Sequence, residues 1–158
     1  MTQETPNIHL VFRSRERLLS VSLRHVVEVV PAFSLLHTPG LSPVLAGMIA
    51  FRGDILPVID SAVLLGEAAT AIDPDRQFII LRDAGYGSAL LIDAVVDIID
   101  IGDEASIRSF GTGSGHPFVG LVQMGEDMIL IIDVPALERI EGIGTLPDLS
   151  VTLLEQQG

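Results

Sequence analysis

An internal repeat constrains the fold of this chain more than any other feature of its sequence. Residues 47–60 align without a gap with residues 120–133, and the apolar positions of the two blocks correspond. Residues 26–30 and 95–99 also match, because both read apolar, apolar, acidic, apolar, apolar. The repeat predicts two related β-modules in tandem. Each is too small to bury much apolar surface alone, so we expect the two to pack against each other.

Short apolar runs separated by Gly, Pro and Asp clusters predict an all-β chain with little helix. Residues 8–13 and 17–22 read as a hairpin, and residues 26–30 follow as a third strand. Residues 45–51 and 55–59 predict a second hairpin, after which Asp60 caps a short helix. A parallel α/β fold is the alternative, but the crossover helices that it requires are missing.

The charge of the chain excludes several classes of partner. Its 158 residues carry a formal charge of -12 and include no lysine. The chain therefore lacks the cationic surface that would attract nucleic acid or anionic lipid. It has no cysteine, which excludes disulfides, thiolate metal sites and thiol nucleophiles. The first residues do not form a secretory signal, and we expect a cytoplasmic protein whose partner is a protein or a small molecule.

Acidic residues offer the only candidates for catalysis or metal binding. Three aspartates end apolar strands and could hold Mg²⁺, although capping of the following turn explains them better: Asp60, Asp93 and Asp133. A second acidic run lacks the ligand pattern of a calcium loop and reads as a solvated strand edge: Asp97, Asp100, Asp103 and Glu104. We therefore predict no catalytic residue, no metal site and no cofactor.

Arg52 is the residue whose position most suggests binding. It lies at the tip of the second predicted hairpin beside Gly53, inside an apolar block. Arginine forms bidentate contacts at protein interfaces, which favours a partner contact. The alternative is a turn arginine paired with Asp54, and the sequence alone leaves both open.

The block from Ala46 to Asp60, Ala-Gly-Met-Ile-Ala-Phe-Arg-Gly-Asp-Ile-Leu-Pro-Val-Ile-Asp, resembles the CheW family of chemotaxis coupling proteins. Residues 26–30, 90–97 and 120–137 agree with the family in order and spacing. The resemblance implies an all-β fold of two SH3-like five-stranded β-barrel subdomains around a shared hydrophobic core, with short helices. It implies one CheW-like domain over residues 1–158, with two intertwined subdomains, about 7–70 and 76–140, and a C-terminal tail, 141–158.

The resemblance also implies a function without catalysis. Such proteins couple the cytoplasmic tips of methyl-accepting chemoreceptors to the regulatory domain of the histidine kinase CheA, within membrane-associated receptor arrays. Carried over by position, the receptor-binding residues are Val26, Glu28, Gly47 and Arg52, and the kinase-binding residues are Phe78 and Ala89.

The chain departs from the family pattern at three places: Ala50-Phe51, Ser61-Ala62 and Ala89. These departures suggest a divergent copy, and a scaffold of a pilus-motility or biofilm signalling array is an alternative. A second alternative function is that of a small-ligand-binding or hydrolytic β-barrel.

Overall fold

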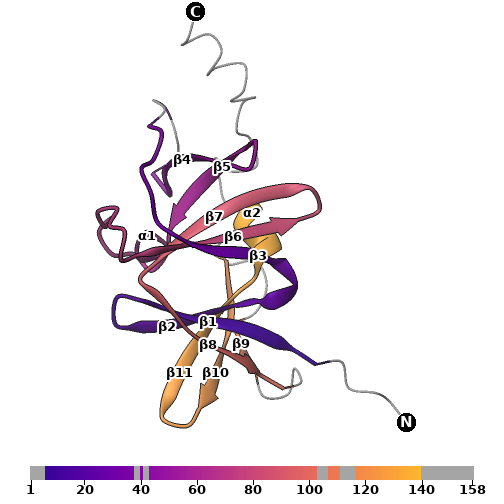
Figure 1. The fold of residues 1–158 in the computed structure, drawn as a ribbon. Coiled ribbons are helices and arrows are strands. Elements are labelled where there is room, and N and C mark those ends of the chain that lie inside the picture. Colours follow the sequence, from indigo (N-terminus) through magenta and orange to yellow (C-terminus); the bar gives the residue numbers. More distant parts are fainter. Residues whose placement is uncertain (1–5, 38–39, 41–42, 103–106, 111–116, 140–158) are drawn as a thin grey trace, which may run out of the picture.

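The computed structural model describes residues 6–37, 40, 43–102, 107–110 and 117–139, which form two β-sheets and three short helical turns (Figure 1). The strands of the first half are β1 (Ile8–Ser14), β2 (Arg17–Ser22), β3 (Val26–Pro31), β4 (Leu45–Phe51) and β5 (Asp54–Asp60). Those of the second half are β6 (Gln77–Asp83), β7 (Tyr86–Ile92), β8 (Ala94–Asp100), β9 (Ile107–Ser109), β10 (Phe118–Met124) and β11 (Asp127–Ile132). The helical turns are η1 (Leu23–His25), α1 (Ser61–Leu64) and α2 (Val134–Glu138).

The strands form two mixed sheets, which we call sheet A and sheet B. Sheet A has the order β8-β1-β2-β11-β10-β9, and sheet B has the order β3-β6-β7-β5-β4. Neighbouring strands are antiparallel except for the pairs β2–β11 and β5–β7. The all-β prediction with short helices is confirmed, as are the hairpins β1–β2 and β4–β5. Sheet B has the predicted five strands, whereas β9 gives sheet A a sixth.

The two copies of the repeated block fold alike. Hairpins β4–β5 and β10–β11 each carry a bulge in their first strand, at Leu45/Gly47 and at Phe118/Gly120, and each is followed by a short helix. Each sheet takes strands from both of the predicted segments, 7–70 and 76–140. Sheet A joins β1 and β2 to strands of the second half, and sheet B joins β6 and β7 to strands of the first. The halves therefore exchange strands, and the predicted tail, 141–158, lies outside the described residues.

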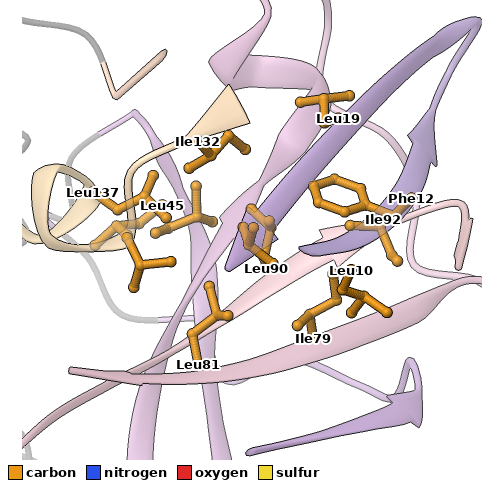
Figure 2. Packing of buried hydrophobic residues seen from close by; sticks show 13 residues of the cluster. Leu10, Phe12, Leu19, Leu45, Ile79, Leu81, Leu90, Ile92, Ile132 and Leu137 are labelled. Carbon is orange, nitrogen blue, oxygen red and sulfur yellow. The ribbon is translucent and has the colours of Figure 1, made fainter. Parts of the chain in front are cut away.

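The largest apolar cluster lies between the two sheets and beneath α2 (Figure 2). Phe12 and Leu19 contribute to it from sheet A, Ile79 and Leu90 from sheet B, and Leu137 from α2. Two smaller clusters lie on the other faces, one on sheet B around Phe78 and one on sheet A around Ile131. Strands β6 and β7 are thus apolar on both faces, which explains their continuous apolar sequence. None of the described helices is long and apolar enough to cross a membrane.

Candidate functional site

Arg52 lies in the two-residue turn between β4 and β5 and is held in a defined position. Its backbone has a φ of 48°, in the left-handed region, and 68% of its side chain is exposed. The guanidinium lies 5.0 Å from the centre of the Phe51 ring, a cation–π distance. Its Nη2 lies 2.6 Å from Oε2 of Glu28. The alternative pairing with Asp54 is wrong, because Asp54 pairs with Arg82 at 3.2 Å.

The Arg52–Glu28 pair connects the two edges of sheet B. Glu28 lies on β3 and Arg52 follows β4, and these strands are the first and last of the sheet. The Oε2 atom of Glu28 is buried and has no aligned hydrogen bond, so the contact is an ion pair only. Glu28 thus neutralises Arg52 in the free protein and leaves most of the guanidinium exposed.

The other two predicted receptor-binding residues present little to a partner. Val26 is partly buried and packs against the cluster between the sheets. Gly47 is buried, and a Cβ there would lie 3.0 Å from the carbonyl oxygen of Leu36. This close approach lets Leu36 and Met48 exchange two backbone hydrogen bonds of 2.7 and 2.9 Å. Glu28 and Arg52 are therefore the two members of the set that contact each other, and Gly47 makes room for a neighbouring segment.

The predicted kinase-binding side chains are inaccessible. Phe78 and Ala89 are fully buried in the apolar cluster on sheet B, so a partner cannot touch either side chain in this conformation. The family pattern marks positions along the chain, but it does not indicate which face of a strand carries each side chain. Both faces of β6 and β7 are covered here, and this burial follows from their central place in sheet B.

Sheet A carries a surface related to the Arg52–Glu28 pair by the repeat, which the sequence analysis did not identify as a site. Asp97 on β8 occupies the place of Glu28, and Gly125 occupies that of Arg52. Among the described residues, Asp97 pairs with no cation. Its neighbours Val96 and Ile98 are 46% and 54% exposed on this edge strand. The internal repeat could have identified this surface from the sequence, because it aligns residues 95–99 with residues 26–30.

Two of the three strand-ending aspartates have partners for their side chains. Asp60 is buried, accepts from the amide of Ala62 at the start of α1, and accepts from Thr70 through its other oxygen. The predicted cap is therefore confirmed. Asp93 binds Arg76, whereas the Asp133 side chain makes no capping hydrogen bond. No group of three acidic or histidine side chains among the described residues could hold a metal ion.

Two titratable groups outside the candidate site have shifted pKa values. His9 is buried and its Nδ1 lies 2.9 Å from Oγ of Ser20. Burial, with a smaller contribution from the charge of Arg24, lowers the pKa of His9 to about 4. Burial and the nearby Asp83 raise the pKa of Glu138 at the end of α2. His9 is therefore neutral at pH 7 and has a structural role inside sheet A.

Comparisons with known proteins agree on one family. The CheW-like domain model matches residues 9–141. A probable chemotaxis protein CheW from Rhizobium etli is 30% identical over 138 residues, which cover 81% of this chain and 84% of that protein. The crystal structure of the scaffolding protein TtCheW from Thermoanaerobacter tengcongensis matches with a TM-score of 0.74 at 29% identity, over 89% of this chain and 92% of that one. The chain therefore belongs to the CheW-like domain family.

Proposed function

We propose that this protein is a non-catalytic adaptor that couples chemoreceptors to the histidine kinase CheA in bacterial chemotaxis. Its relatives are a probable chemotaxis protein and a scaffolding protein, which supports a scaffold role. The adaptor works in the cytoplasm, at membrane-associated receptor arrays. The observation that carries the proposal is the exposed guanidinium of Arg52, held between Glu28 and Phe51.

Stability does not explain an arginine at position 52. A left-handed conformation costs a residue with a Cβ about 1–2 kcal/mol, whereas glycine adopts it freely. The equivalent turn of the second half has Gly125, with a φ of 65°. The pair with Glu28, whose two side chains are 68% and 35% exposed, returns only about 0–1 kcal/mol. The balance favours glycine, so binding is the better reason for the arginine.

The surroundings of Arg52 indicate the chemistry of its partner. A guanidinium presents a planar set of donors that fits a carboxylate in two hydrogen bonds. Val27, on the strand that carries Glu28, is 47% exposed and adds apolar surface. We expect the receptor to supply an acidic residue that replaces or joins Glu28, next to apolar side chains.

The kinase contact requires a different surface from Phe78 and Ala89, because both are buried. We assign it to the edge strand β8, where Val96 and Ile98 are exposed. This strand lies close to the start of β6, since the side chain of Gln77 accepts from the amide of Val95 at 2.8 Å. The two partners then bind different sheets, as an adaptor requires.

Charge reversal at Arg52 tests the receptor contact. Arg52→Glu should abolish co-sedimentation with receptor fragments while the circular dichroism spectrum stays unchanged. Arg17→Glu is the matched control, because Arg17 is also exposed beside a hairpin turn. Unaltered receptor binding by Arg52→Glu would refute the assignment.

A substitution on β8 tests the kinase contact separately. Ile98→Asp should weaken binding to the CheA regulatory domain and leave receptor binding intact. If Ile98→Asp binds the kinase normally, the assignment to β8 is wrong. If the wild-type chain binds neither partner, the adaptor function itself is wrong.

A further inference from the structure

A group of polar side chains joins the two sheets at one end of their contact. At its centre is Asp93, the single residue between β7 of sheet B and β8 of sheet A. Its Oδ1 accepts from Nε of Arg76 at 3.0 Å, and its Oδ2 accepts from the backbone amide of Arg15 at 2.6 Å. Arg76 precedes β6 of sheet B, and Arg15 forms the tip of the β1–β2 hairpin of sheet A. One carboxylate therefore binds both sheets.

Arg15 extends this connection to the segment that follows α1. Its Nη2 donates to the carbonyl of Ala68 at 2.8 Å, and its Nε lies 3.2 Å from Oε2 of Glu67. The backbone of Arg15 has a φ of 57°, which strains a residue with a side chain. These contacts hold the hairpin tip of sheet A against sheet B.

Buried hydroxyl groups continue the same connection beneath the surface. Ser61 Oγ, at the start of α1, lies 2.6 Å from Ser14 Oγ of β1 and donates to the carbonyl of Leu91 at 2.6 Å. Both serines are fully buried. We call this set the polar joint: Ser14, Arg15, Ser61, Glu67, Arg76 and Asp93.

We infer that the polar joint fixes the angle between the two sheets, and that Asp93 is its positioning residue. The largest contact between the sheets is apolar, and apolar attraction has no direction. Outside the joint, a further directional contact is the hydrogen bond from the amide of Val95 to the side chain of Gln77. Hydrogen bonds and ion pairs are directional, and those of the joint lie at one end of the contact.

Two features of the polar joint are unfavourable for the stability of the protein. Arg76 is 9% exposed, and its Nη2 is buried with no hydrogen-bond partner. A buried donor without an acceptor is unfavourable, although the other nitrogens of Arg76 donate to Asp93, Thr70 and Ala71. Arg15 adds backbone strain at the other side. Arg76 contacts Asp93 through its side chain and Arg15 contacts it through its backbone amide, so one carboxylate fixes both sheets.

In the proposed adaptor, the polar joint would also affect signalling, a step that rests on the proposed function. The receptor contact was assigned to sheet B and the kinase contact to sheet A. Coupling between two sites requires that binding at one be favoured by a particular arrangement of the other. The polar joint would then determine how much of a change at Arg52 reaches β8.

Distances between spin labels on the two sheets test the joint without any partner. The chain has no cysteine, so labels can be attached at introduced cysteines alone. One pair, Ala50→Cys with Glu126→Cys, spans sheets B and A, and a second, Ala50→Cys with Tyr86→Cys, lies within sheet B. All three positions are exposed. Electron–electron double resonance gives the distance distribution of each pair.

Asp93→Asn should broaden the distribution between the sheets and leave the distribution within sheet B unchanged, because asparagine offers only one acceptor oxygen. Asp97→Asn is the matched control and should change neither. Arg15→Gly removes the contacts to Glu67 and Ala68 without strain, and should broaden the same distribution if Asp93→Asn does not fold. An unchanged distribution between the sheets overturns the inference, and so does equal broadening of both pairs. Neither result depends on receptor or kinase binding.

Discussion

The buried His9–Ser20 pair should make the protein sensitive to acid, and a double substitution should remove this sensitivity. Counted from their hairpin turns, His9 and Ser20 of β1 and β2 correspond to Phe78 and Ala89 of β6 and β7. The β6–β7 hairpin therefore has phenylalanine and alanine at the two corresponding places. Replacing both members of a buried hydrogen-bonded pair avoids leaving one without a partner. The test variant is His9→Phe combined with Ser20→Ala.

The expected effect follows from the pKa of His9. It falls from the ordinary 6.5 to about 4 in the folded protein, a difference worth about 3 kcal/mol. Because the folded-state pKa is lowered, the unfolded chain binds the proton more readily, and stability is lost as the pH falls below 6.5. About 2 kcal/mol of the free energy of unfolding should be lost between pH 7 and pH 5 through this one group.

Urea denaturation followed by circular dichroism measures this loss. The free energy of unfolding is determined at pH 7 and at pH 5 for the wild type and for the double variant. Carboxylates titrate in both proteins, so the difference between the two pH dependences isolates His9. The wild type should lose about 2 kcal/mol more than the variant over this range. Equal losses would show that His9 is not held neutral by burial.

Two further predictions concern the glycines and the exchange of strands. A Cβ at Gly120 would lie 2.7 Å from the carbonyl oxygen of Arg108, so Gly120→Ala should cost about 1–3 kcal/mol and speed amide exchange on β9 and β10. Gly53→Ala meets no atom within 4 Å and should cost about 1–2 kcal/mol through backbone strain without changing that exchange, and faster exchange in this control would contradict the steric argument. Cleavage of the chain between Ala69 and Thr70 should give two pieces that unfold cooperatively only when mixed, because each sheet takes strands from both halves; a piece that folds alone would contradict the exchange.

Local features of the fold could be predicted because each depends on a few neighbouring residues. Alternating apolar residues predicted β1 and β2, and a polar turn between them predicted their pairing. Asp60 at the end of an apolar strand predicted the cap of α1. The exposed position of Arg52 followed from its place beside Gly53 in a hairpin turn. In each case, the turn or cap conformation is determined within about four residues.

Contacts between distant residues could not be predicted in the same way. The sequence offered Asp54 as the acid next to Arg52, yet the side chain of Arg52 reaches Glu28 on the opposite edge of sheet B. Phe78 and Ala89 stand in continuous apolar runs, which are typical of strands covered on both faces, so their burial, unlike the contact between Arg52 and Glu28, could have been predicted from the sequence. The bonds of Asp93 to Arg15 and Arg76 depend on the packing of the sheets, which no local pattern encodes.

The exchange of strands between the halves follows from two short connections. In sheet A, β8 lies beside β1 on the side away from β2 and runs parallel to β2. Because β3 corresponds to β8 in the repeat, the sequence of β3 would also suit this place. The chain would then have to return along the six residues of β2, about 20 Å. The three residues of η1 span at most about 14 Å, and the connection between β7 and β8 is Asp93 alone. The chain must leave the sheet at both points, so β3 completes sheet B and β8 completes sheet A. Arg52 and Glu28 thus lie on a sheet that contains β6 and β7 of the second half, so the first half alone does not bring the two residues together.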